Sequence, residues 1–213
     1  MFHVMLVEDQ EIVRQGLRMI LEQDEQIRIS CEASNGLEAM EKLTAHRVDI
    51  IFMDIRMPDM NGIEATRKIK EQWPDLPILI LTTFNDDEYA LEALNEGASG
   101  FLLKTSDGKK LIEAVYSVMK GGLVLHDEVT AKVMPRLLKQ SRKTSAAADV
   151  ELTERERAIT KSIGQGKTNK EIAAELYLSV GTVKNHISVI LQKTNLRDRT
   201  QLAIYAVTHD ISE

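Results

Sequence analysis

Hydrophobic residues in the first 122 positions form short runs that alternate with longer segments of helical periodicity. The short runs have the length and composition of buried strands, and they read HVMLV, IRISCEA, DIIFM, PILIL and SGFLL. The longer segments repeat their apolar residues every three to four positions, as in QEIVRQGLRMILEQ, GLEAMEKLTAH and GIEATRKIKEQW. Strands that alternate with helices in this way predict a doubly wound α/β fold with a five-stranded parallel sheet.

The hydrophobic pattern changes after residue 150, where only helical periods remain, in pieces of about 10 to 15 residues. Two capping-box spellings, Thr153 with Glu156 and Thr168 with Glu171, mark the starts of two of these helices. Helical pieces of this length, joined by short turns, predict a small all-α domain.

A polar, small and basic stretch at residues 139–149, KQSRKTSAAAD, separates the two patterns. It predicts an exposed linker, preceded by a further helix at about residues 127–138 that Pro135 interrupts. We therefore expect an α/β domain over residues 1–122, a linker with a helix over residues 123–149, and the helical domain over residues 150–213.

Composition places the chain among soluble globular proteins. Of 213 residues, 43% are hydrophobic and 28% are charged. The single cysteine, Cys31, excludes an intramolecular disulfide and a cysteine-rich metal site, and its apolar neighbours predict a core thiol in a reducing compartment. No run approaches about 18 uncharged apolar residues, and Glu8 and Asp9 follow the first apolar segment too soon for a signal peptide. We expect a cytoplasmic protein without a membrane segment.

The net charge of −6 is unevenly distributed. The excess of acidic residues lies in residues 1–125, whereas residues 149–213 are close to neutral. A neutral domain is compatible with nucleic-acid binding only if its lysines and arginines gather on one face.

Chemically reactive residues follow four of the expected strands. Glu8 and Asp9 come after the first strand, Asp54 after the third, Thr82 after the fourth and Lys104 after the fifth. In an open α/β sheet ligands bind at the carboxyl ends of the strands, and a strand order of 2-1-3-4-5 would bring the three carboxylates together. Their mutual repulsion is relieved by a divalent cation, and Mg²⁺ suits an all-oxygen site.

Each of these residues alone has an ordinary structural explanation. An acidic residue after a strand is usually a turn former or a helix cap, and a single lysine is usually solvated. The coincidence of acidic, threonine and lysine residues at four strand ends of one sheet is hard to assign to capping, and it favours a functional site.

These residues also carry a family resemblance. The segments LVEDQ, IIFMDIRMPDMNG, ILTTF and GFLLK resemble the receiver domain of two-component response regulators, over residues 1–122. The resemblance implies that Asp54 accepts a phosphoryl group and that Lys104 neutralises charge on it. It also implies that Mg²⁺ is held by Glu8, Asp9, Asp54 and the backbone carbonyl of Arg56.

Two further residues have switch roles by resemblance only. Thr82 would hydrogen-bond the new phosphoryl group, and Phe101, three residues before Lys104, would hold the position of the switch aromatic. The alternative for Phe101 is a core aromatic of the last strand, and the residues alone favour this alternative.

The segment at residues 179–195, SVGTVKNHISVILQKTN, predicts a helix with Ser179 near its N-cap. One face of this helix is apolar, with Val183, Ile187, Ile190 and Leu191, and another is polar, with Lys184, Asn185, Ser188 and Gln192. His186 lies toward the packed side, which favours a structural histidine. A short helix that ends at Tyr177 and Leu178 precedes this one across a tight turn. Although such spacing also occurs in simple packing, it is what a helix-turn-helix needs to enter the major groove.

The segments LTERERAI, GKTNKEIAAEL, SVGTVKNHISVILQKTN and RDRTQLAIYA resemble the four-helix DNA-binding domain of the LuxR type, over residues 150–208. A LuxR-type domain behind a receiver is the arrangement of the NarL/FixJ family. The resemblance makes Lys184, Asn185 and Ser188 the readers of base edges. The resemblance also implies that DNA phosphates are contacted by Thr182, Lys170, Asn169 and Lys193. By the same resemblance, the last helix, at residues 200–207, would pair two such domains through a surface with Leu202, Ala203 and Ala206.

The resemblance implies a transcription regulator, not an enzyme. A sensor histidine kinase would phosphorylate Asp54, and phosphorylation would control homodimerisation and sequence-specific binding to paired half-sites in double-stranded DNA. RNA polymerase is a further candidate partner.

Two alternatives from other classes compete with this interpretation. A haloacid-dehalogenase-like phosphatase needs a second aspartate two residues after Asp54, where Arg56 stands. A receiver-like regulator that is switched by a ligand would usually lack part of the acidic set, which is complete here.

Overall fold

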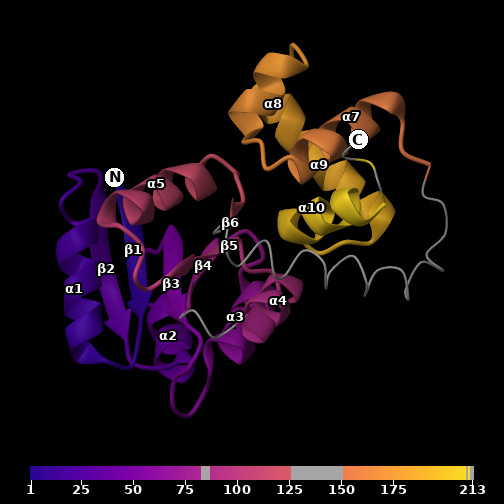
Figure 1. The fold of residues 1–213 in the computed structure, drawn as a ribbon. Coiled ribbons are helices and arrows are strands. Elements are labelled where there is room, and N and C mark those ends of the chain that lie inside the picture. Colours follow the sequence, from indigo (N-terminus) through magenta and orange to yellow (C-terminus); the bar gives the residue numbers. More distant parts are fainter. Residues whose placement is uncertain (83–86, 126–150, 210, 212–213) are drawn as a thin grey trace.

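The structure, a computed structural model, describes residues 1–82, 87–125, 151–209 and 211. Its first part is a parallel sheet with the strand order β2-β1-β3-β4-β5-β6 (Figure 1). The strands are β1 (Phe2–Val7), β2 (Ile27–Ala33), β3 (Ile50–Asp54), β4 (Ile78–Thr82), β5 (Gly100–Leu103) and β6 (Val124–Leu125). The expected order 2-1-3-4-5 is confirmed. Strand β6 is an addition, because two residues at a sheet edge are too short for a hydrophobic pattern to indicate.

Helices cover both faces of the sheet (Figure 1). They are α1 (Glu11–Leu21), α2 (Gly36–Leu43), α3 (Gly62–Gln72), α4 (Asp87–Asn95) and α5 (Gly108–Met119). Ile51 belongs to the core cluster shared with α2, α3 and α4, whereas its neighbour Phe52 belongs to the cluster shared with α1 and α5. Because β3 is buried on both faces, its apolar run is continuous rather than alternating.

Cys31 is 9% exposed and lies in the core, as the apolar run around it predicts.

The C-terminal part consists of α7 (Glu154–Gly164), α8 (Asn169–Glu175), α9 (Val180–Thr194) and α10 (Arg199–Thr208). Both expected capping boxes, at Thr153 and Thr168, are formed, and the Ser179 side chain accepts from the backbone N–H of Thr182 as the N-cap of α9. A core with Ile159, Ile172 and Val183 at its centre holds the four helices together. Since this core is separate from those around the sheet, the domain has its own source of stability.

The structure differs from expectation in the end of one helix and in the exposure of another, and it does not describe a third expected helix. Helix α8 ends at Glu175 rather than at residue 178, because Tyr177 takes a left-handed backbone conformation with φ of 54°. Leu202, Ala203 and Ala206 of α10 are buried inside the chain rather than available as a pairing surface. The helix expected at residues 127–138 lies outside the described residues.

Candidate functional site

The carboxyl ends of two neighbouring strands, β1 and β3, bring the acidic residues together. Glu8 and Asp9 follow β1, Asp54 is the last residue of β3, and one carboxylate oxygen from each lies within 4.8 Å of the others. Glu8 is 0% and Asp54 is 4% exposed, whereas Asp9 is exposed. Lys104, which follows β5, places Nζ 2.8 Å from Glu8 Oε2 and 2.9 Å from Asp54 Oδ1. The strand order therefore assembles the set that the sequence indicates.

The electrostatics of this cluster are unbalanced. Burial raises the pKa of Asp54 and that of Glu8, although Lys104 opposes both shifts. Burial also lowers the pKa of Lys104, but its hydrogen bonds to Glu8 and Asp54 outweigh this effect and the pKa is raised. One lysine thus faces three carboxylates, two of which are buried. A cation that binds oxygen ligands would offset the remaining negative charge, so these carboxylates fit Mg²⁺.

The contacts of Asp54 distinguish its two oxygens. Among the residues that the structure describes, Oδ1 accepts from the backbone N–H of Ile55 at 2.8 Å and from Lys104. These contacts fix the orientation of the buried carboxylate, whereas Asp9 of the same site is solvent-exposed.

The two switch candidates lie in the strands beside the cluster. Thr82 ends β4 with 1% exposure, and its carbonyl accepts from the backbone N–H of Lys104 at 2.8 Å. Phe101 is 1% exposed in the core beside α2, α3 and α4, where the core alternative places it. In register, Phe101 pairs with Ile80 on one side and with Leu125 of β6 on the other.

The side chain of Arg56 leaves the cluster and reaches α4. Arg56 is exposed, and its guanidinium carbon lies 5.6 Å from the ring centroid of Tyr89. Only its backbone carbonyl was expected to take part in the metal site.

The predicted base readers lie on one face of α9. Lys184, Asn185 and Ser188 are exposed, whereas Val183 and Ile187 of the opposite face are buried. His186 is half-buried toward the packed side. This placement follows from the 3.6-residue period of the helix.

The four predicted phosphate contacts differ in their availability. Lys170 is exposed, and the Thr182 hydroxyl lies 2.8 Å from that of Ser179 at the start of α9. Lys193 instead places Nζ 2.7 Å from both carboxylate oxygens of Glu156. Asn169 is 8% exposed and accepts from Arg199 at 2.8 Å. In this conformation Lys193 and Asn169 therefore bind other parts of the chain.

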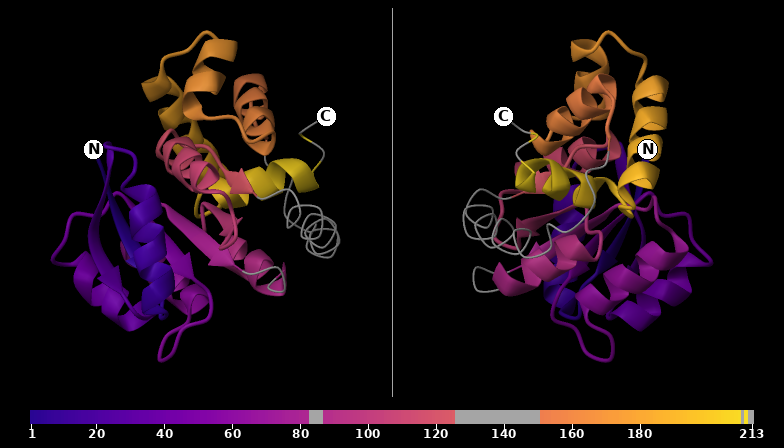
Figure 2. Two further views of the ribbon diagram at one scale, coloured as in Figure 1. Left: turned by 60° about the vertical axis from the view of Figure 1, so that its left-hand side comes forward. Right: turned by 90° about the vertical axis from the view of Figure 1, so that its right-hand side faces the viewer.

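The start of α10 docks on the end of α4. The Thr200 hydroxyl donates to the carbonyl of Ala98 at 2.8 Å, and the carbonyl of Asn95 accepts from Arg197 at 2.9 Å and from Gln201 at 3.1 Å. Figure 2 shows α10, in yellow, against the α4 edge of the sheet. Sequence reasoning missed these contacts, since no local pattern pairs residues about 100 positions apart.

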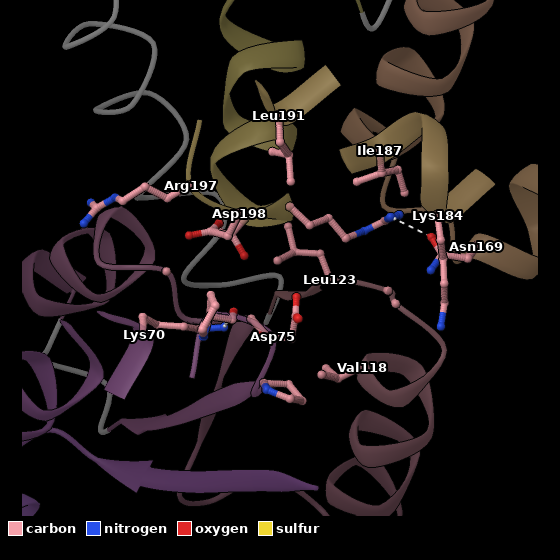
Figure 3. Close-up of a pocket in the computed structure, with 18 of the residues that line it drawn as sticks. Lys70, Asp75, Val118, Leu123, Asn169, Lys184, Ile187, Leu191, Arg197 and Asp198 are labelled. Atoms are coloured by element: carbon pink, nitrogen blue, oxygen red, sulfur yellow. Dashed lines mark hydrogen bonds between the residues drawn. The ribbon is translucent and has the colours of Figure 1, made fainter. Parts of the chain in front are cut away.

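A cavity of about 510 Å³ lies between the two halves of the chain (Figure 3). Lys184, Ile187 and Ser188 of α9 line one side, and Lys70 and Asp75 line the other. Figure 3 shows the Lys184 side chain directed into this space. The burial of Lys70 in the wall of this cavity lowers the pKa of its ammonium group. Two of the three predicted base readers thus face the sheet-containing half, which is a closed arrangement.

Comparison with known families agrees with both halves of the chain. Residues 4–116 match the response regulator receiver domain family, and residues 150–206 match the luxR family of bacterial regulatory proteins. The chain belongs to the NarL/FixJ-type two-component response regulators. The regulator has an N-terminal receiver domain and a C-terminal LuxR-type DNA-binding domain.

Several relatives cover the full length of the regulator. The transcriptional regulatory protein LnrK of Bacillus subtilis strain 168 is 42% identical in an alignment of 219 positions that covers 100% of this chain and 99% of LnrK. LiaR of the same strain is 40% identical, covering 97% of each chain. The crystal structure of response regulator ChrA, from a heme-sensing two-component system, is 33% identical with a TM-score of 0.55, covering 99% of this chain and 98% of ChrA. The regulator is thus a transcription regulator by relationship.

No helix in the described part of the regulator is both long and apolar enough to cross a membrane.

Proposed function

We propose that the regulator accepts a phosphoryl group on Asp54 from a sensor histidine kinase and then binds paired half-sites in double-stranded DNA as a homodimer. One observation carries this proposal: a carboxylate that is 4% exposed ends β3 with an ammonium group 2.9 Å away. The kinase and RNA polymerase are the protein partners proposed, and the cytoplasm is the proposed location.

The chemistry at Asp54 is a displacement on phosphorus. An oxygen of the Asp54 carboxylate attacks the phosphorus of a phosphohistidine, the P–N bond breaks, and its electron pair stays on the imidazole as the acyl phosphate forms. Since Oδ1 is engaged by Lys104 and Ile55, Oδ2 is the oxygen we assign to the attack. Lys104 then offsets negative charge on the transferred group.

Glu8, Asp9, Asp54 and Lys104 form the receiver cluster, and the residues around Asp54 have supporting roles. Glu8, Asp9, Asp54 and the Arg56 carbonyl would hold Mg²⁺, which when bound supplies further neutralisation of phosphoryl charge. The Thr82 hydroxyl, at the end of the strand next to β3, donates to the phosphoryl oxygens. Movement of Thr82 frees space for Phe101, which is packed one strand away.

The DNA-binding role rests on the polar face of α9. Lys184 and Asn185 carry the donor groups that match guanine and adenine edges, and Ser188 extends the same face. Thr182, Lys170, Asn169 and Lys193 contact phosphates, which for Asn169 and Lys193 requires that they leave Arg199 and Glu156. Because two base readers line the cavity beside the receiver, DNA binding requires the two halves to separate.

Phosphorylation reaches DNA through assembly in this proposal. A receiver that dimerises once phosphorylated tethers two DNA-binding domains, and the second half-site is then bound at a high effective concentration.

Intact-mass measurement tests the phosphoacceptor. Incubation with Mg²⁺ and a small phosphodonor should add the mass of one phosphate to the unmodified chain and nothing to Asp54→Asn. The matched control is Asp59→Asn, an exposed aspartate in the loop after β3, which should keep the mass gain. An unchanged gain in Asp54→Asn would remove the assignment, and no gain in the unmodified chain would favour a receiver switched by a ligand.

A further inference from the structure

Tyr177, in the turn between α8 and α9, combines two unfavourable features. Its side chain is 95% exposed, and its backbone has a φ of 54°. A left-handed conformation strains a residue with a Cβ, and an exposed phenol gains nothing from packing in return.

The other residues with the same backbone conformation show that this choice is unusual. Among the described residues with positive φ that are not glycine, the other two are Asp59 and Asn195. Aspartate and asparagine tolerate the left-handed region because their short polar side chains hydrogen-bond locally, whereas tyrosine has no such compensation. Asparagine or glycine at position 177 would build the same turn with less strain.

The surroundings of Tyr177 are suited to a polyanion. The sequence contains no aspartate or glutamate between Glu175 and Asp198, in a chain that is acidic overall. Across the turn, α9 begins with the hydroxyl groups of Ser179 and Thr182, whose oxygens lie 2.8 Å apart. The exposed phenolic hydroxyl of a residue in this carboxylate-free segment can donate to a phosphate oxygen.

The position of the turn relative to α9 points to the DNA backbone. In a helix-turn-helix the start of the second helix approaches the base edges, so the turn before it lies near the phosphates that border the groove. The closed arrangement leaves Tyr177 almost fully exposed while Lys184 and Ser188 line the interdomain cavity.

We propose that Tyr177 is a DNA contact, with its hydroxyl donating to a backbone phosphate, and that the strained turn is kept for this contact. The inference rests on the proposed function, because it needs α9 in the major groove. It adds a neutral, sequence-independent contact to the set that the resemblance implies.

The test uses the full chain, phosphorylated with a small phosphodonor and Mg²⁺. Two probes are needed: a duplex selected by this chain from a random-sequence pool, and an unrelated duplex of equal length. For each bound DNA-binding domain, Tyr177→Phe should weaken binding to both by about 3- to 10-fold, the value of one hydrogen bond. The slope of log affinity against log salt concentration should stay unchanged, whereas Lys170→Gln should reduce its magnitude by about 0.9 for each bound domain. Tyr116→Phe, which removes a receiver hydroxyl bound to Asp24, is the matched control and should bind both duplexes normally.

A second variant tests the strain. Tyr177→Gly should lower DNA affinity at least as much as Tyr177→Phe, yet raise the midpoint of thermal unfolding of the DNA-binding domain by about 2–5 °C. The inference is overturned if Tyr177→Phe binds within twofold of the unmodified chain, or if Tyr177→Gly is less stable. If the unmodified chain binds neither duplex, the proposed function fails as well, whereas normal binding by Tyr177→Phe beside weakened binding by Lys184→Ala rejects this inference alone.

Discussion

Asp9 differs from the other two carboxylates of the receiver cluster in being exposed. Its removal should therefore leave the fold intact while taking away one proposed oxygen ligand. We expect Asp9→Ala to weaken Mg²⁺ binding by about 10-fold or more and to slow phosphorylation by a small phosphodonor. Calorimetric titration with Mg²⁺ and the rate of mass gain measure the two effects. If the Mg²⁺ affinity were unchanged, Glu8 and Asp9 would be capping residues and not metal ligands.

Lys193 has two roles to reconcile, a proposed phosphate contact and an ion pair with a carboxylate that is 4% exposed. Lys193, and then the backbone N–H of Thr153, hold the pKa of Glu156 below its ordinary value. We expect Lys193→Met to lower the free energy of unfolding by about 1–2 kcal/mol at pH 7, because it leaves Glu156 buried without its cation. Urea denaturation measures this loss.

The pH dependence of that loss has a defined sign. Since the pKa of Glu156 is depressed in the folded state, the stabilisation is present above the ordinary pKa of 4.5 and disappears as pH falls below it. The difference between the unmodified chain and Lys193→Met should therefore narrow below about pH 4. The double variant Lys193→Met/Glu156→Gln should regain part of the lost stability, and a failure to do so would contradict the ion-pair explanation.

At the scale of elements, Glu38 ties β2 to the start of α2. Its carboxylate accepts from Lys42 at 2.6 Å and from the backbone N–H of Ser34 at 2.7 Å. Lys42, followed by Ser34, lowers the pKa of Glu38 from 4.5 to about 2. Because the side chain is 35% exposed, solvent screening reduces the stabilisation to about 1 kcal/mol.

We expect Glu38→Gln to lower the free energy of unfolding by about 1 kcal/mol at pH 7, as measured by urea denaturation. The depressed pKa places this stabilisation above pH 4.5 and removes it as pH falls toward 2. Glu41→Gln, on the same helix, is the control and should change little. Equal stability of Glu38→Gln and the unmodified chain at pH 7 would show that the connection between β2 and α2 does not depend on this carboxylate.

The elements that sequence reasoning predicted well are those with strong local signals. The apolar runs that end at Asp54 and Thr82 are buried strands, and Ser179 caps α9 because a hydroxyl at that point satisfies a free backbone N–H. Placing Asp54 beside Glu8 needed the strand order 2-1-3-4-5, one of the common orders of a doubly wound sheet, which the alternation of strands and helices alone does not determine.

The missed features depend on the rest of the fold. Strand β6 forms because the edge of β5 is available for pairing, and its two residues carry no pattern of their own. The left-handed turn at Tyr177 was assigned to helix because tyrosine rarely adopts that conformation. The docking of Thr200 on Ala98 joins surfaces that periodicity describes one at a time.

For the whole molecule, we expect the contact between α4 and α10 to control whether DNA can reach α9. Arg197 donates to the carbonyl of Asn95 and lies 3.8 Å from the carboxylate of Glu96. We expect Arg197→Ala to shift the unphosphorylated chain toward separated domains and to raise its DNA affinity about 2- to 10-fold. Binding to the same duplex before and after treatment with a phosphodonor measures the change.

A fragment of residues 150–213 is the control, since it contains the core of the DNA-binding domain without the receiver. Arg197→Ala should not raise DNA affinity in this fragment. A rise there would assign the effect to the DNA surface instead of domain separation. Light scattering with and without the phosphodonor should show a dimer only after phosphorylation, and DNA binding by a phosphorylated monomer would replace the dimer mechanism with domain release.

Because Cys31 is buried, an engineered disulfide could be used to lock the closed arrangement. Because the sequence has no second cysteine and this one is 9% exposed, a cysteine pair introduced at the end of α4 and the start of α10 would meet little competition for an oxidant or a cross-linker. Mild oxidation could then hold the halves together and reduction could release them. Separation of the two halves would then depend on the reducing agent, whatever the phosphorylation state of Asp54, while dimerisation would still depend on phosphorylation.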